Sequence, residues 1–160
     1  MPRFNPHARN AQHSATDVRV VLDTNTLVSG VISPSGAPRR LLDGARIQTF
    51  ELCSSVVLIA ELLDVLSREK FAARMAQAGL TPSDIVRELR RLAHITSPKN
   101  VPRVIANDPD DDHVLACALT AQADLIVSGD KHLHSLGGYY QGIRIVDAAV
   151  AIGIVLAQQD

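Results

Sequence analysis

Aromatic residues are scarce in this sequence: they make up 3% of its 160 residues, and tryptophan is absent. A binding surface built from stacked aromatic platforms is therefore not expected. Neither sign of charge dominates, because 16 Lys and Arg stand against 17 Asp and Glu and the formal net charge is −1. This balance excludes a wholly basic surface, so any nucleic-acid binding has to use a local patch.

Cysteine and long apolar segments are also rare. Two cysteines are too few to suggest a disulfide framework. The longest apolar stretch, residues 148–157, has ten residues, about half of what a membrane span requires. Because the N-terminus also lacks the hydrophobic core of a signal peptide, we expect a cytoplasmic protein with no membrane contact.

The length of 160 residues is that of one ordinary domain. Residues 1–16 are polar and show no hydrophobic period, so they are predicted to form a flexible N-terminal tail. Regular patterning begins directly after this segment. Residues 17–160 are therefore expected to fold as a single domain.

Short apolar strands alternate with helices along the rest of the chain. Strands are predicted at residues 18–22, 48–53, 94–97, 125–127 and 143–146. Helices are predicted at residues 26–32, 38–46, 56–67, 69–78, 82–93, 109–122, 131–136 and 147–157. This alternation favours an α/β sandwich around a mainly parallel sheet.

Two aspartates follow strands of the predicted sheet. Asp23 comes directly after the strand at 18–22, and Asp130 comes three residues after the strand at 125–127. Ligands of open parallel sheets bind beyond the carboxyl ends of the strands, so a shared site is the favoured interpretation. The alternative is that each aspartate caps the helix that follows it.

A denser group of acids occupies residues 108–112, where four of five residues are aspartate. Asp108 is expected to cap the helix that follows. Asp111 shares a helix face with Leu115, and that face should turn inward because the helix is apolar almost all round beyond this point. Asp112 is expected to point outward, to the rim or to solvent, and is kept as the reserve for the site.

One further acid, Glu61, is predicted in the middle of a helix among apolar neighbours. It either reaches solvent, pairs with an arginine, or contributes to a site, because a buried carboxylate needs a partner. Together, Asp23, Glu61, Asp111 and Asp130 would repel one another without a cation. Carboxylate oxygens suit Mg²⁺ or Mn²⁺, and such a centre can hydrolyse a phosphodiester bond.

Four segments resemble the motifs of PIN-domain proteins, most closely the branch of VapC-like toxins from toxin–antitoxin systems. They are VLDTNTLVS at 21–29 with PSGAP at 34–38, IAEL at 59–62, DPDDD at 108–112 with Leu115 and Ala118, and IVSGDKHL at 126–133. The resemblance extends over about residues 18–150. The four motifs in this order are specific, although each alone is weak.

The resemblance implies a three-layer α/β/α sandwich with a mainly parallel central sheet. It also implies an Mg²⁺- or Mn²⁺-dependent endoribonuclease that cleaves RNA, forms homodimers and often pairs with a small antitoxin. By motif match, the acidic metal and catalytic site would comprise Asp23, Glu61, Asp111 and Asp130, with Asn25 and Ser128 as polar neighbours that orient water or carboxylates. The adjacent acids of the third motif allow Asp111 and Asp112 to exchange roles.

Two other functions remain open at this point. Residues 23–26 superficially resemble the Asp-x-Asp-x-Thr loop of haloacid-dehalogenase-like phosphatases, but position 25 is Asn, so the acid that protonates the leaving group is missing. A non-catalytic PIN module used for RNA binding or dimerisation is the second alternative. The presence of all four acids counts against it.

Basic residues supply the candidates for RNA contact. Arg39, Arg40, Arg103 and Lys131 are RNA-binding candidates if they surround the acidic pocket. His132 and His134 have the spacing of a weak metal motif. With no cysteine nearby, they are interpreted as exposed side chains.

Overall fold

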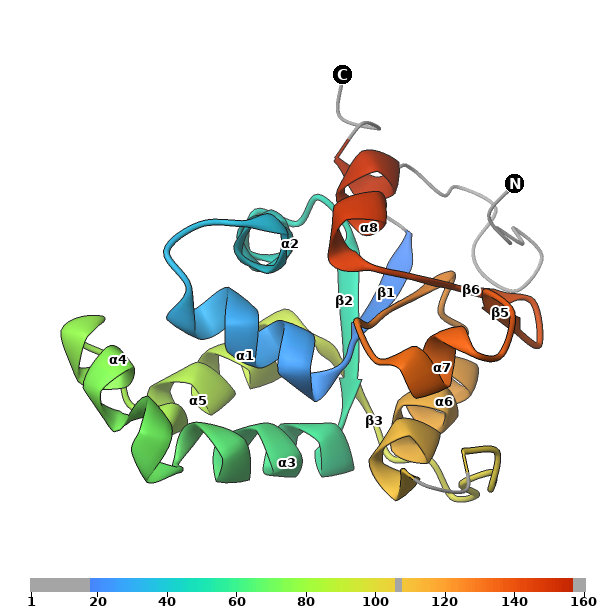
Figure 1. Cartoon of the computed structure of the whole chain (residues 1–160), viewed down its shortest axis with the longest axis horizontal. Coiled ribbons are helices and arrows are strands. Elements are labelled where there is room, and N and C mark those ends of the chain that lie inside the picture. The colour runs from blue at the N-terminus through green and yellow to red at the C-terminus, as the bar shows by residue number, and fades with distance from the viewer. Residues whose placement is uncertain (1–17, 106–107, 157–160) are drawn as a thin grey trace.

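A computed structural model describes residues 18–105 and 108–156, and it confirms the expected α/β sandwich with a mainly parallel sheet (Figure 1). The six strands are β1 (Arg19–Leu22), β2 (Glu51–Ser55), β3 (His94–Thr96), β4 (Leu125–Val127), β5 (Tyr139–Tyr140) and β6 (Ile143–Val146). Their order across the sheet is β3-β2-β1-β4-β6-β5, and only β5 runs antiparallel to its neighbour. Strands β1 and β4 are therefore adjacent at the centre.

Helices connect these strands and are all short. They are α1 (Thr24–Ile32), α2 (Ala37–Arg46), α3 (Val56–Leu66), the 3-10 turn η3 (Glu69–Phe71), α4 (Ala72–Gln77), α5 (Pro82–Leu92), α6 (Pro109–Ala121), α7 (Lys131–His134) and α8 (Ala148–Val155). Thr81 starts α5 with a reciprocal capping box, and Pro82 follows at the first helical position, as the sequence predicts. Within the described ranges, no helix is long and apolar enough to cross a bilayer.

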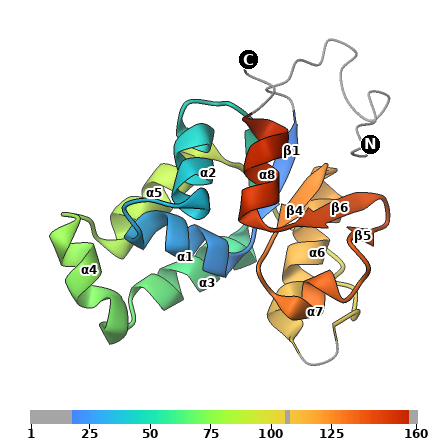
Figure 2. The ribbon, with the colours of Figure 1, turned by 45° about the horizontal axis from the view of Figure 1, so that its top comes forward.

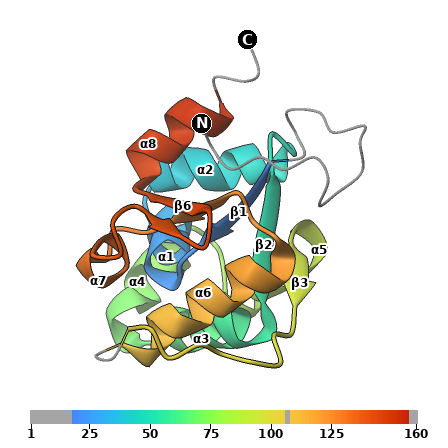
Figure 3. The same ribbon diagram turned by 90° about the vertical axis from the view of Figure 1, so that its right-hand side faces the viewer.

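Alternate residues of the central strands pack on opposite faces of the sheet. Val20 and Leu22 contribute to a core with α1, α2, α3, α5 and α8, whereas Val21 contributes to a second core with α6. Figure 2 shows α1 and α2 on one side of the strands and α6 on the other, and Figure 3 shows α6 running beside β2 and β3. Because both faces are covered, the two central strands β1 and β4 are almost uniformly apolar.

The second strand begins later than the sequence indicates, at Glu51 instead of residue 48. Gln48 adopts a left-handed backbone conformation with φ of 60°, and the Thr49 N–H donates to the Gly44 carbonyl oxygen. These residues therefore close the C-terminal end of α2 and are not available for pairing in the sheet. The predicted helix at 69–78 is likewise divided into η3 and α4.

Strand β5 has no counterpart in the prediction from sequence, which treats this region as a loop. It pairs antiparallel with β6 through a tight hairpin in which Gln141 and Gly142 both have positive φ, 48° and 83°. Two central residues of this kind match the right-handed twist of a hairpin. The strand adds an antiparallel edge beyond β6, far along the sheet from β1.

Candidate active site

A pocket of about 180 Å³ opens where β1 and β4 end. The two ends are held together because the Asp23 N–H donates to the Val127 carbonyl oxygen at 3.1 Å. Six acids and one base are among its lining residues, which are Asp23, Thr24, Asn25, Glu61, Val65, Arg68, Asp108, Asp110, Asp111, Val114 and Asp130. The pocket thus brings together all four acids singled out from the sequence.

Asp23 is both a helix cap and a lining residue of the pocket. Its Oδ1 accepts a hydrogen bond from the Thr26 N–H at 2.9 Å, which caps α1. Its Oδ2 accepts from the Ser128 hydroxyl at 2.5 Å. The two interpretations of Asp23 made from the sequence are therefore compatible, because each uses a different oxygen of the same buried carboxylate.

Ser128 links the ends of the two central strands. Its side chain is fully buried, and its Oγ accepts a hydrogen bond from the Asp130 N–H at 2.9 Å while donating to Asp23. Asp130 in turn caps the short helix α7, since its Oδ1 accepts from the His132 N–H at 2.7 Å. Asn25, the other predicted polar neighbour, is exposed and lines the same pocket.

Glu61 enters the pocket from the opposite side, on α3. Its side chain is half-buried, and the pKa of its carboxyl is raised, first by burial and then by the negative charges of Asp110 and Asp108. The nearby Thr24 hydroxyl opposes this shift in pKa. No arginine pairs with Glu61 in the described part of the chain, and the charge of this half-buried carboxyl adds to the repulsion inside the pocket.

Asp111 is the most perturbed acid of the group. It is 5% exposed, and its Oδ2 has no hydrogen-bond partner among the described residues. Burial, followed by the charges of Asp108 and Asp130, raises the pKa of its carboxyl to about 8. A buried carboxylate with an unused oxygen beside other acids is the environment that a bound cation would neutralise.

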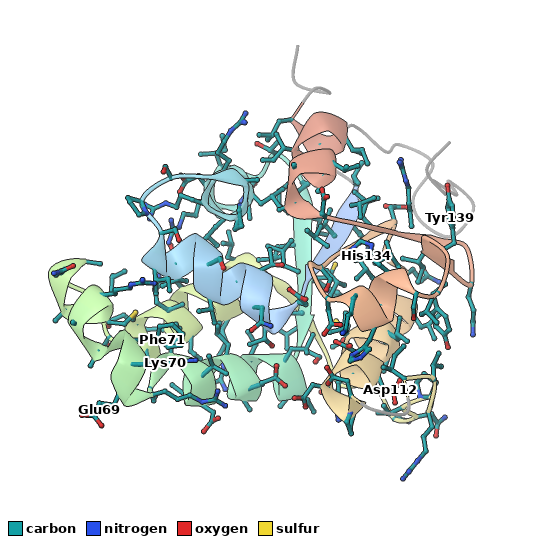
Figure 4. The ribbon with its side chains drawn as sticks, viewed as in Figure 1. Glu69, Lys70, Phe71, Asp112, His134 and Tyr139 are labelled. Carbon is teal, nitrogen blue, oxygen red and sulfur yellow. The ribbon has the colours of Figure 1, made fainter. Side chains whose placement is uncertain are left out.

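Asp112 is buried, and the expectation that it points to the rim or to solvent is wrong. Its side chain is 6% exposed, and Oδ1 accepts hydrogen bonds from the Val104 and Ile105 N–H groups at 3.0 and 2.8 Å. One helical residue turns the side chain by about 100° away from the pocket, as predicted. The segment before α6 covers that face, so Asp112 fixes this segment (Figure 4).

Two residues close to the acids were assigned other roles from the sequence. Asp108 was expected to cap α6, but its side chain makes no capping hydrogen bond. His132 was interpreted as exposed, yet it is half-buried and its Nδ1 lies 3.4 Å from Asp130 Oδ1. Spacing could have identified both, because Asp108 is three residues before Asp111 and His132 lies in the first turn after Asp130.

None of the four predicted RNA-binding cations is among the residues that line the pocket. Arg39 pairs with Asp43 at 3.4 Å and Arg103 borders another hollow, while Arg40 and Lys131 are exposed elsewhere. The cation at the pocket is Arg68, whose guanidinium lies 3.2 Å from the Asp64 carboxylate. Arg68 lies beyond the end of α3 and has an extended backbone, so the helical period of Glu61 does not predict this placement.

Taken together, the fold and the pocket define an α/β protein with a carboxylate-rich site at the carboxyl edge of a parallel sheet. A family model for the PIN domain matches residues 19–132, and the chain belongs to that family. Among solved structures, it is similar to a chain in the crystal structure of VapBC2 from Rickettsia felis bound to a DNA fragment from their promoter. The TM-score is 0.54 at 12% identity, over 80% of this chain and 97% of that chain.

At that identity, the structural similarity concerns the fold. A comparison with curated proteins gave no match. The family assignment therefore rests on the motif-bearing segment from β1 to the start of α7, which contains every acid of the pocket.

Proposed function

We propose that this protein is a metal-dependent endoribonuclease and the toxin of a toxin–antitoxin pair. The observation that carries the proposal is the buried, unpartnered Oδ2 of Asp111 inside a pocket lined by six acids. Membership of the PIN-domain family supports the same activity. The fold similarity to a chain of the VapBC2 structure supports a small antitoxin as partner, and the motifs shared with VapC-like proteins support a homodimer.

The residues present fit Mg²⁺ or Mn²⁺. Both cations take hard oxygen ligands, and the pocket offers carboxylate oxygens from four different segments of the chain. Asp23, Asp111 and Asp130 would hold the cation, with Glu61 completing the ring of acids. When bound, the cation would lower the pKa of a coordinated water and neutralise charge on the phosphoryl oxygens.

The protein's own residues would position these groups. Ser128 holds the Asp23 carboxylate in one orientation through its hydroxyl, and the same hydroxyl fixes the backbone at Asp130. Arg68 would bind a phosphate of the RNA at the mouth of the pocket, because it is the basic residue among those that line it. RNA could approach so many acids only after a cation has offset part of their charge.

The geometry disfavours the phosphatase alternative. Asn25 lines the pocket in place of the second acid of that motif. The pocket contains all four predicted acids, and this argues against the non-catalytic alternative.

A circular single-stranded RNA is the most direct substrate for a test, because only an endonuclease can linearise it. We expect the wild-type protein to linearise it with Mn²⁺ or Mg²⁺ and not with EDTA. Asp23→Asn should be inactive although folded, since Asn still caps a helix, while the matched surface variant Asp43→Asn should be active. Cleavage by Asp23→Asn at the wild-type rate, or a trapped aspartyl-phosphate at Asp23, would refute the proposal.

A further inference from the structure

Among the described residues, the imidazole of His132 lies close to three of the acids that line the pocket. Its Nδ1 is buried, has no hydrogen-bond partner among the described residues, and lies 3.4 Å from Asp130 Oδ1 and 4.0 Å from Asp108 Oδ2. Ligand atoms of Asp108, Asp111, Asp130 and His132 all lie within 4.8 Å of one another. Donor atoms around one octahedral cation are separated by about 3 to 4 Å, so this grouping is close to that required.

The position of His132 is set by the fold. Its backbone N–H donates to Asp130 Oδ1 at 2.7 Å, which fixes the first turn of α7 beside the pocket. The neighbouring His134 is engaged elsewhere, because its Nε2 lies 2.6 Å from the Ser128 carbonyl oxygen (Figure 4). Of these two histidines, His132 is the one whose ring nitrogen faces the acids.

A second observation supports a bound ligand at this point. Asp111 is only 5% exposed, and its Oδ2 has no hydrogen-bond partner in the described part of the chain. The unused oxygen comes from α6 and the unused nitrogen from α7. Two buried donor atoms without partners, on different helices and within one cluster, indicate a common occupant.

We propose that His132 Nδ1 is a ligand of the cation, together with Asp108, Asp111 and Asp130, and that this mixed set favours Mn²⁺ over Mg²⁺. The inference rests on the proposed metal-dependent function and adds to it two ligands, Asp108 and His132, and a selectivity. Mg²⁺ requires oxygen ligands and gives up its water reluctantly, whereas first-row transition metals accept imidazole. A site made of oxygen ligands alone would not select Mn²⁺ over Mg²⁺ in this way.

The competing explanation is that a protonated His132 forms an ion pair with Asp130 and Asp108. In that arrangement the imidazolium would occupy the cation's place and would be displaced when metal binds. The two explanations differ in whether the histidine nitrogen is bonded to the bound ion. That difference is measurable by pulsed electron paramagnetic resonance of Mn²⁺, which detects coupling to a ligating ¹⁴N nucleus.

The experiment loads the full-length protein with Mn²⁺ alone and records the electron spin-echo modulation. Wild type should show imidazole ¹⁴N coupling, and His132→Asn should lose it. The matched variant His94→Asn, at an exposed position on strand β3, should retain it. In parallel, titration of the free Mn²⁺ signal should show at least a tenfold loss of Mn²⁺ affinity in His132→Asn, with little change for Mg²⁺.

A second variant, His132→Asp, replaces the nitrogen by an oxygen. It should lack ¹⁴N coupling and should lower the preference for Mn²⁺ over Mg²⁺, and it serves for the same test if His132→Asn does not fold. Tight Mn²⁺ binding by wild type without ¹⁴N coupling would overturn this inference and leave the proposed function standing. Absence of any Mn²⁺ or Mg²⁺ binding would overturn the proposed function as well.

Discussion

Replacing Asp111 by Asn should stabilise the metal-free protein and abolish its stabilisation by metal. The pKa of the Asp111 carboxyl is raised from 3.8 to about 8 in the folded state. The folded state therefore binds more protons than the unfolded state between these values. Consequently, the free energy of unfolding contributed by this group is highest below about pH 4 and falls as pH rises towards 8. Because Asn cannot ionise, its contribution to the free energy of unfolding does not fall as the pH rises.

The size of the effect follows from the same shift. One pKa unit corresponds to about 1.4 kcal/mol, so a rise of about four units would amount to ~5 kcal/mol for an isolated group. The pocket is open to solvent and salt, and neighbouring acids share the repulsion, which reduces this value. We expect Asp111→Asn to raise the free energy of unfolding by about 2 kcal/mol at pH 8 without metal.

Urea denaturation at pH 4 and pH 8, with EDTA or with Mn²⁺, measures each part of the prediction. The variant should be more stable than wild type at pH 8 in EDTA, and the difference should vanish near pH 4. With Mn²⁺ at about 100 times its dissociation constant, wild type should gain about 2.7 kcal/mol, while Asp111→Asn should gain far less. A variant that is less stable than wild type at pH 8 in EDTA would refute the reasoning.

The adjacent residue supplies a control of opposite sign. Asp112 is as buried as Asp111, but its Oδ1 accepts hydrogen bonds from two backbone N–H groups, and such bonds are stronger to a carboxylate than to an amide. Asp112→Asn keeps an acceptor and loses the charge, so it should lower the free energy of unfolding by about 1–2 kcal/mol. The metal-induced gain in stability should be retained, because this side chain does not face the acids of the pocket.

Three further predictions concern the surroundings of the pocket. Ser128→Ala removes the hydroxyl that orients the carboxylate after β1, so calorimetry should show Mn²⁺ affinity reduced by about tenfold; unchanged affinity would exclude that role. Arg68→Ala should raise the KM for RNA with Mn²⁺ affinity unchanged, whereas Arg39→Ala should alter neither in the same assays. Gly30→Ala would place a Cβ 2.9 Å from a backbone carbonyl oxygen of α2, and denaturation should show a loss of about 1–3 kcal/mol.

Local signals in the sequence account for most of the fold. The three residues before Asp23 and the strand at 125–127 are apolar throughout, which is typical of strands covered on both faces. The start of α5 is marked by Thr81-Pro82, and the start of α6 by Pro109 after an aspartate. These features depend only on neighbouring residues, so they can be predicted without knowledge of tertiary contacts.

Features that depend on contacts distant in sequence were not predictable in the same way. Strand β5 has two residues and no alternation of its own, and it exists because β6 offers an edge for pairing. The burial of Asp112 likewise depends on the segment before α6 folding back over the helix. The helix phase around Asp111 was predicted in the correct sense, but the sequence does not reveal what covers the opposite face.

The site itself was predictable where it follows from sheet topology and unpredictable where it follows from side-chain packing. Asp23 and Asp130 meet because β1 and β4 are adjacent and parallel, so their carboxyl ends share one edge. The positions of Arg68, which follows α3, and of His132, on α7, depend on how these helices pack in the fold. A sequence pattern assigns such residues to a helix face, but only packing determines what that face meets.

Two acids of the pocket also begin helices, and this double use explains how the carboxylates are held in a repulsive group. Asp23 and Asp130 each give Oδ1 to a backbone N–H of the helix that follows. Those hydrogen bonds fix the side-chain orientation before any cation arrives. Asp111 has no such compensation, because its Oδ2 is unpartnered. The repulsion is therefore concentrated on the one acid whose neutralisation by a cation would release the most free energy.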